Sequence, residues 1–216
     1  MISDTKVVAI GGGTGLSTML KGLKLHTHNI TAVVTVADDG GSSGILRSDL
    51  GMLAPGDVRN CVSALAEVDP VMGELLNFRF KDGSLKGHSL GNLFLAALNE
   101  TSSSFDEAVK KFSHLTGVVG TVYPVTNESV TLSALLEDGR LIEGESHIGV
   151  HHDGPKNGIV KLMVNPEKPK AVDGVIKALE KADISDASIS ASDLCDEILA
   201  VMTQITVEGV TGTITW

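Results

Sequence analysis

Apolar positions near the start of the chain change from a continuous run to a helical spacing within a few residues. Residues 7–10 are all apolar, which is typical of a strand buried in a parallel sheet. Five residues follow, four of them glycine, and apolar side chains then recur at helical spacing over residues 16–23. The pattern predicts a strand, a glycine turn and a helix in immediate succession.

Similar patterns predict further elements along the chain. Strands are expected at 30–37, 117–125 and 159–164, a hairpin at 130–136 and 141–148 around Asp138-Gly139, and helices at 57–68, 89–98, 104–112 and 171–182. Asp57 and Ser89 are expected to cap two of these helices, and residues 104–107 form a capping box. At 216 residues, this succession predicts one large α/β domain, or such a domain with an appendage.

The glycine turn at residues 11–15 is the first candidate for chemistry. A glycine turn that opens a helix presents backbone N–H groups and partial positive charge, which suit a phosphate or carboxylate. The spacing is Gly-x-Gly-x-Gly, with Leu16 where the dinucleotide fingerprint has its last glycine, and the Gly-Lys-Ser/Thr ending of a P-loop is absent. The alternative is a tight turn between strand and helix that binds nothing.

An acidic pair, Asp38 and Asp39, follows the predicted strand at 30–37 and precedes the sequence GGSSG. Open α/β sheets place their ligands at the carboxyl ends of the strands, where an acid can accept a ribose hydroxyl or hold a hydrated metal ion. A solvated turn is the alternative. Arg47, a little further on, can offer paired donors to a phosphate.

A second helix start carries polar side chains, because His88 and Ser89 precede the helical pattern and Asn92 lies in its first turn. This start can also face an anion, although a histidine in a capped loop is the alternative. Arg59 lies unfavourably in the first turn of another helix, so it is either paired with an anion or exposed.

Composition narrows the class of partner. The net charge of −10 and the aromatic content of 3% argue against nucleic acid or membrane insertion, while a hydrophobic fraction of 42% supports a core. Cys61 and Cys195 lack metal or redox spacing, and the start of the chain does not resemble a signal peptide. His147, His151 and His152 lack supporting carboxylates and are interpreted as loop residues. A soluble, cytoplasmic protein is expected.

Four motifs, GGGTG, TVADDGGSSGILR, PGDVRNCVSALA and GHSLGNLFLAAL, closely resemble the CofD-like family, on the YvcK-type branch often labelled gluconeogenesis factors. The resemblance spans residues 6–183 and implies a Rossmann-like, three-layer α/β fold with a mainly parallel sheet and a β-hairpin insertion. The enzyme branch of the family transfers a phospholactyl group from a guanosine diphosphate-linked donor with magnesium. The YvcK-type branch is linked to UDP-sugar binding, central carbon metabolism and cell-wall homeostasis.

The resemblance implies a ligand site for a nucleotide or nucleotide sugar. The residues that it assigns to this site are Gly12, Gly13, Thr14, Asp38, Asp39, Ser42, Ser43, Asn60, His88, Ser89 and Asn92. Asp38 and Asp39 are also the candidates for a magnesium ion. A binding protein with a regulatory role is the leading interpretation, a phospholactyl-type transferase is the second, and a scaffold without tight ligand binding is the third. The same interpretation allows a homo-oligomer.

The family pattern changes near the end of the chain. Residues 1–183 are expected to form the family domain, and 184–216 an atypical segment with a helix at 192–204 and a hairpin around Glu208-Gly209. The sequence VEGVTGTITW at the end is weakly similar to a fragment of a periplasmic amino-acid-binding protein. A natural truncated variant and an engineered composite both remain as explanations.

Overall fold

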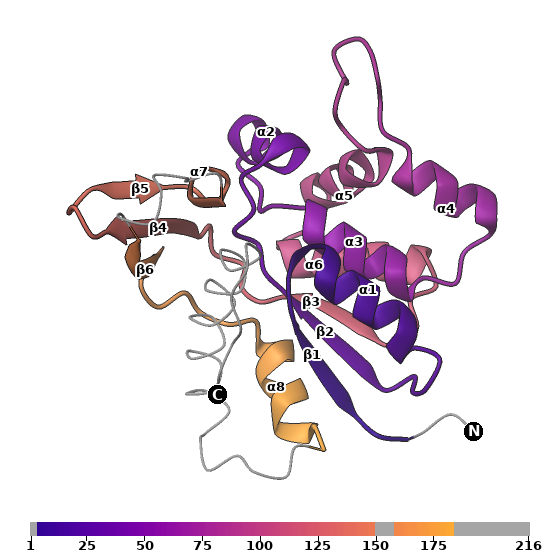
Figure 1. Ribbon diagram of the computed structural model, residues 1–216. Helices are drawn as coiled ribbons and strands as arrows, with labels where there is room; N and C mark the ends of the chain where they lie inside the picture. The colour runs from indigo at the N-terminus through magenta and orange to yellow at the C-terminus, as the bar shows by residue number, and fades with distance from the viewer. Residues whose placement is uncertain (1–3, 150–157, 184–216) are drawn as a thin grey trace.

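The computed structural model of the protein describes residues 4–149 and 158–183 (Figure 1). The predicted helix at 192–204, the hairpin around Glu208-Gly209, and both His151 and His152 lie outside these ranges.

A parallel sheet lies at the centre of the fold. Its strands are β1 (Val7–Gly11), β2 (Ile30–Val34) and β3 (Thr121–Pro124), in that order. The pairing runs from Val7 opposite Ile30 to Gly11 opposite Val34, and β3 continues the same register on the other side of β2. Because the strands are parallel, their carboxyl ends meet at one edge of the sheet.

Helices cover both faces of this sheet (Figure 1). The covering helices are α1 (Gly13–Leu23), α3 (Gly56–Leu65) and α6 (Phe105–Leu115) on one face and α8 (Asp173–Lys181) on the other. Their apolar sides join the strands in one core, in which Leu20, Val62, Phe112 and Val175 are fully buried. The three-layer α/β prediction is therefore confirmed. None of the helices in the described ranges has the length and apolar composition needed to cross a membrane.

A second, antiparallel sheet lies beyond the carboxyl edge of the first (Figure 1). Its strands are β5 (Leu141–Glu143), β4 (Thr131–Leu136) and β6 (Ile159–Asn165), in that order. The predicted hairpin around Asp138-Gly139 is confirmed, and Gly139 has a φ of 84° in its turn. Two further helices, α4 (Pro70–Asn77) and α5 (Leu90–Glu100), pack against each other beside α6.

Three predicted elements differ from the structure. The strand expected at 30–37 ends at Val34, because β1 ends opposite it, and the chain then continues into α2 (Gly41–Leu50), a helix that the sequence analysis did not predict. The second hairpin strand ends at Glu143, because Gly144 adopts a φ of 92° and α7 (Glu145–Gly149) begins directly after it. Asp57 lies in the first turn of α3 and does not cap it, because Pro55 is the capping residue.

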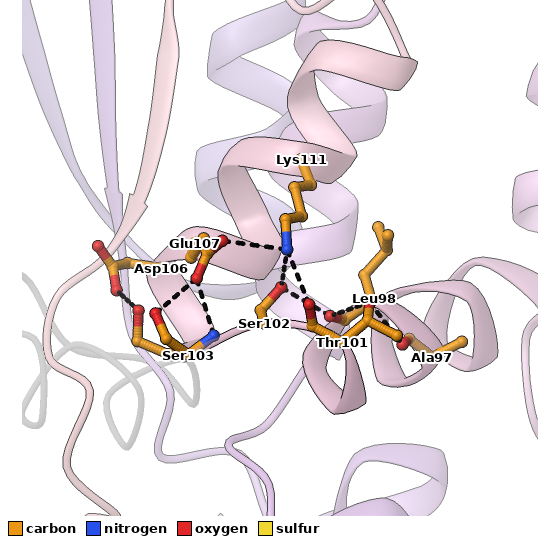
Figure 2. Close-up of polar contacts among 9 residues, drawn as sticks. Ala97, Leu98, Thr101, Ser102, Ser103, Asp106, Glu107 and Lys111 are labelled. Atoms are coloured by element: carbon orange, nitrogen blue, oxygen red, sulfur yellow. Dashed lines mark hydrogen bonds and ion pairs between the residues drawn. The ribbon is translucent and has the colours of Figure 1, made fainter.

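The junction between α5 and α6 is fixed by charged side chains (Figure 2). The Glu107 carboxylate accepts the backbone N–H of Ser103 at 2.8 Å and also its hydroxyl, and it pairs with Lys111 at 3.0 Å. Lys111 also donates to the Thr101 carbonyl and the Ser102 hydroxyl, both at 2.9 Å. These contacts hold α5 against α6, and α5 in turn begins at the candidate site.

The predicted capping box is therefore present in a shifted form. Ser104 is the N-cap of α6, but its hydroxyl donates to Asp106, and Glu107 reaches one residue further back, to Ser103. Hydrogen bonds from Ser103, followed by the contact with Lys111, lower the pKa of Glu107 to about 2. The helix start is thus stabilised by two carboxylates in its first turn.

Gly120 gives a test of the parallel sheet. It has a φ of 91°, and a Cβ there would lie 2.4 Å from the Ile30 carbonyl oxygen, at the point where β3 joins β2. We expect Gly120→Ala to destabilise the protein by more than 1 kcal/mol, because backbone strain and a steric clash add. Urea unfolding measures the change. Gly83→Ala, which has a φ of 73° but open space around its Cβ, is the control for strain alone. Equal losses in both variants would contradict the clash.

Candidate functional site

Three helices begin at the carboxyl edge of the parallel sheet. Their N-caps are Gly12 for α1, Gly40 for α2 and Pro55 for α3, and none of these caps makes a side-chain hydrogen bond within the described ranges. The first N–H groups of α1 and α3 bond instead to the side chains of Asp57 and Ser43, and the other N–H groups of each first turn carry partial positive charge. This edge is suited to anionic groups.

The glycine turn is closely packed at Gly12 and open at Gly13 and Thr14. A Cβ at Gly12 would lie 2.2 Å from Thr35 Cγ2 and 3.0 Å from Asp57 Oδ2, so only glycine fits there. Gly13 has a φ of 62° with open space around it, and Thr14 is exposed. Gly12 therefore has a packing role, whereas Gly13 and Thr14 form the accessible part of the turn.

Asp38 and Asp57 lie together beside this turn. Asp38 Oδ1 accepts the Gly40 N–H at 2.9 Å, and Asp57 accepts the backbone N–H of Gly13. Burial raises the pKa of Asp57 to about 6, and the charge of Asp38 contributes to the rise, while the bond from Gly13 opposes it. One carboxylate thus already lies at the start of α1, next to a second one.

Glu145 of α7 is a third carboxyl group near this pair. Burial raises its pKa to about 8, with further contributions from the charges of Asp38, Asp57 and Asp39, and Arg47 opposes them. Its Oε2 atom is buried without a hydrogen-bond partner in the described part of the chain. The sequence analysis missed Asp57 as a site residue because its position resembled a cap, and Glu145 because its segment resembled a strand.

Asp39 faces a different element from Asp38. Its Oδ1 atom accepts the Ser146 N–H at 2.8 Å, which fixes the start of α7, and Gly144 lies so close that a Cβ would be 2.4 Å from Oδ2. Within residues 4–149 and 158–183, no three histidine, cysteine, aspartate or glutamate side chains are placed to hold a metal ion. Magnesium keeps several waters and is usually held by only one or two protein carboxylates, so the assignment of Asp38 and Asp39 to a magnesium ion stays a prediction.

The Arg47 side chain is hydrogen-bonded to backbone carbonyls in two separate segments of the chain. Its guanidinium donates to the carbonyls of Ala37 at 3.0 Å, Asp38 at 3.2 Å and Val130 at 2.7 Å. It thereby joins the loop after β2 to the segment that leads into β4. The sequence analysis expected that Arg47 can offer paired hydrogen-bond donors to a phosphate, and in the structure these donors bond to backbone oxygens that a loop between two sheets leaves unpaired.

A buried polar network connects α2 with α5. Ser42 Oγ lies 2.9 Å from His88 Nδ1, and Asn92 Nδ2 donates to Ser42 Oγ at 3.1 Å. The Ser42 hydroxyl has two acceptor lone pairs and one proton, so the tautomer of His88 decides which of the two groups donates in their contact. Ser89 caps α5 as predicted, through a 3.2 Å bond from the Asn92 backbone N–H.

Arg59 extends this network to α3 and α4. Its Nε atom donates to Asn92 Oδ1 at 3.3 Å and its Nη1 atom to Asn77 Oδ1 at 2.8 Å, while the residue is only 7% exposed. Burial lowers the pKa of Arg59, and the charge of Arg79 adds to this effect. The exposed alternative is wrong, because Arg59 is buried, and the anionic group that acts on it is the Asp57 carboxylate, which opposes the fall of its pKa. The hydrogen-bond partners of Arg59 are neutral amides.

The structure thus divides the predicted site residues into groups. Gly12, Gly13 and Asp38 lie around Asp57, and Ser43 joins them because its hydroxyl accepts the Gly56 N–H at 3.2 Å. Ser42, His88, Ser89 and Asn92 form the buried network. Asn60 is half-buried in α3, and Thr14 is exposed at the start of α1. Ser42 and Ser43 are adjacent in α2, so the two groups meet there.

Comparisons with known proteins agree with this architecture. The model of the family described as 2-phospho-L-lactate transferase CofD matches residues 7–213. The chain is 53% identical over 183 residues to a Clostridium acetobutylicum homologue from the gluconeogenesis factor group, and 45% identical over 182 residues to the gluconeogenesis factor of Bacillus subtilis. A crystal structure of a UPF0052-family protein from Bacillus halodurans superposes with a TM-score of 0.80 at 39% identity.

The alignments cover most of this chain but a smaller share of each relative. The two sequence alignments cover 85% and 83% of this chain, but 41% and 56% of the relatives, so the chain spans about half of their length. The superposition covers 94% of this chain and 66% of the Bacillus halodurans chain. The family match includes residues 184–213, and the division of the chain at residue 183 stays a prediction.

Glu145 makes stability depend on pH. Its pKa of about 8 in the folded protein lies above its ordinary value of 4.5, so the folded state keeps a proton that the unfolded chain releases. Stability should therefore fall as pH rises from 4.5 to 8. We expect Glu145→Gln to be about 1–3 kcal/mol more stable than the parent at alkaline pH, a discounted value because water partly reaches the carboxyl group.

Urea unfolding at about pH 4 and pH 8.5 measures this difference. At the lower pH both proteins carry a neutral side chain at position 145, so the gain should nearly disappear. Glu143→Gln, at an exposed position of β5, is the matched control and should change little at either pH. A parent protein more stable than Glu145→Gln at alkaline pH would refute the assignment.

Arg59 gives a test of the buried network. Arg59→Met fills similar space but leaves the buried Asn92 side-chain oxygen without its donor, which we expect to cost about 1–3 kcal/mol of unfolding free energy. Lys110→Met, at an exposed position of α6, is the control and should change stability by at most about 0.5 kcal/mol. Equal stability of the Arg59 variant and the parent would show that the network is dispensable.

Proposed function

This chain belongs to the CofD family, and we propose that it binds a nucleotide sugar at the carboxyl edge of its parallel sheet. The observation that carries the proposal is the convergence of three helix starts on one edge of the sheet, around the half-buried Gly13 and the exposed Thr14. A diphosphate suits these N–H groups because they carry partial positive charge. No lysine or arginine contact is needed for this mode of binding.

The acidic residues favour a ligand with hydroxyl groups near the phosphates. Asp38 is half-buried, and one of its oxygens is already bonded to Gly40, so the other can accept a sugar or ribose hydroxyl. Asp57 lies against Gly12 and Gly13, and its raised pKa allows its protonated form to donate to a phosphate oxygen near neutral pH. The two carboxyl groups thus fit a polar, hydroxylated anion better than an apolar ligand.

The name of a relative supports a regulatory role. The Bacillus subtilis relative is named a gluconeogenesis factor, and this chain shares 45% identity with it over 182 residues. We infer that the nucleotide sugar acts as a signal of carbon supply, which the protein reports to the pathways of central carbon metabolism and cell-wall synthesis. UDP-linked sugars are the first candidates, as the motif resemblance implies.

A transferase is the second candidate, favoured by the description of the matching family model. The Ser42–His88 pair offers a hydroxyl and a base within hydrogen-bonding distance, an arrangement that can support group transfer. Incubation with a guanosine diphosphate-linked lactate donor and a deazaflavin acceptor distinguishes the two functions. Product formation favours the transferase, whereas binding without turnover favours the regulatory protein.

Thr14 tests the binding mode. A carboxylate at this exposed position of the first turn of α1 should stabilise the helix but repel a diphosphate. We expect Thr14→Glu to weaken binding of UDP-N-acetylglucosamine at least about tenfold, which corresponds to about 1.4 kcal/mol. Isothermal titration calorimetry with UDP-N-acetylglucosamine, UDP-glucose and GDP measures the affinities.

Thr18→Glu is the matched control, because Thr18 is exposed one turn further along α1 and away from its N–H groups. It should keep the parent affinity. Thermal unfolding shows whether each variant is folded. Equal affinity of Thr14→Glu and Thr18→Glu for a ligand that binds the parent would exclude the start of α1 as the phosphate site.

A further inference from the structure

A cavity of about 310 Å³ lies at the amino ends of the parallel strands, at the opposite end of the sheet from the candidate site. This amino-end cavity is lined by residues 6–8, 28–31 and 120–121, around the starts of the three strands, and by Ala178 and Lys181 of α8. Ligand pockets in proteins span roughly 300–1,000 Å³. A cavity at the lower end of this range suits a small molecule better than a nucleotide sugar.

One row of side chains across the sheet forms the floor of the amino-end cavity. Val8 is paired with Thr31, and Thr31 is paired with Thr121, so the three side chains project to the same face. Helix α8 covers that face, because a Cβ at Gly174 would lie 2.5 Å from the ring of Tyr123, two residues after Thr121. The hydroxyl groups of Thr31 and Thr121 have no hydrogen-bond partner within residues 4–149 and 158–183. The floor therefore offers two adjacent hydroxyl groups to a ligand.

Three basic residues surround this floor. Lys6, His28 and Lys181 all line the cavity, and all three are exposed. In the described part of the chain, none of these side chains has an ion pair or a hydrogen bond. Among the described residues, the charged ones that line the cavity are all basic. In a chain with a net charge of −10, such a cavity favours an anion locally.

Two neighbouring features oppose an anion and limit its affinity. The end of α8 carries partial negative charge, which Lys181 partly balances. The Asp183 carboxylate lies at the edge of the sheet, where it accepts the backbone N–H of Lys6 at 2.9 Å. We therefore expect weak binding, of the strength that suits an abundant small molecule.

We propose that the amino-end cavity binds a small phosphate monoester that carries hydroxyl groups. A phosphate monoester has a charge of about −1.5 to −2 near neutral pH, which matches the basic residues better than the single charge of a carboxylate. Lysine binds phosphate as a point charge, and the hydroxyls of Thr31 and Thr121 can both donate to and accept from the hydroxyl groups of the ligand. This inference is independent of the proposed nucleotide-sugar binding, because the two sites lie at opposite ends of the strands.

Phosphorus NMR titration of glycerol 3-phosphate with the 216-residue chain tests the site. We expect a dissociation constant of about 1 mM or lower. The double variant Lys6→Gln and Lys181→Gln should raise it at least about tenfold, because two of the three basic groups are lost. A parent chain that does not bind glycerol 3-phosphate, or a double variant that binds it like the parent, would overturn the proposal.

The matched control carries Lys81→Gln and Lys110→Gln, at exposed positions that do not line the cavity. It loses the same charge as the first double variant and should keep the parent affinity. Thermal unfolding shows whether each variant is folded. Equal weakening in the two double variants would show that overall charge sets the affinity, and it would overturn the assignment to the cavity.

Asp183→Asn tests the same site by a gain of affinity. The amide oxygen can still accept the Lys6 N–H, but a negative charge beside the cavity is lost. We expect glycerol 3-phosphate to bind about threefold more tightly. Partial unfolding cannot produce such a gain, so this result does not depend on the lysine variants. Unchanged or weaker binding would contradict a phosphate next to Lys6.

Thr14→Glu separates the amino-end cavity from the proposed nucleotide-sugar site. Thr14 lies at the start of α1, at the other end of the strands, so this variant should bind glycerol 3-phosphate like the parent. Weaker binding by Thr14→Glu, together with parent affinity in the Lys6 and Lys181 variant, would place the phosphate at the carboxyl edge. That result would overturn the cavity proposal and leave the nucleotide-sugar proposal standing.

A lipid headgroup is the other source of a phosphate monoester. The net charge of −10 opposes binding to an anionic membrane, so we expect that the chain does not sediment with vesicles of phosphatidic acid. Sedimentation with these vesicles that the Lys6 and Lys181 variant loses would assign the cavity to a lipid and overturn the proposal of a small soluble ligand.

Discussion

The close approach of Gly12 to Thr35 and Asp57 is the contact on which the candidate site depends. A Cβ at Gly12 would lie 2.2 Å from Thr35 Cγ2, so the turn after β1 can pack against the chain after β2 only without a side chain. The Thr35 N–H bonds the Gly11 carbonyl at 3.0 Å, directly beyond the paired strands. This packing brings the starts of α1 and α3 to one place, and the ligand groups that we propose need both.

Electrostatic balance limits what this place can hold. The helix starts favour negative charge, but Asp38, Asp57 and Glu145 already supply it, and burial raises the pKa values of Asp57 and Glu145 to about 6 and 8. A site that keeps its carboxyl groups partly protonated can accept a phosphate with less repulsion than a fully ionised one. The protonation of Asp57 and Glu145 is thus linked to the ligand binding that we propose.

The buried network from Ser42 to Arg59 gives this edge its rigidity. Amide and guanidinium groups from α3 and α5 are bonded to each other in a buried region, and Arg59 also bonds the exposed Asn77 of α4. Groups of this kind are costly to leave unpaired, so they hold the helices in one arrangement. Asn77 belongs both to this network and to α4, so the network also links α4 to α3.

The sequence by itself determined the order of the main strands and helices, the glycine turn, the helix start at Ser89 and the family, because these depend on local periodicity, capping and continuous motifs. The tertiary structure decided the rest. The regular pattern of residues 41–50 is too weak to reveal α2, and only Gly144 and its contact with Asp39 end β5. Arg47, Asp57, Arg59 and Glu145 acquire their partners across distant parts of the chain. Burial and long-range contacts set their roles, and neither is encoded in local spacing.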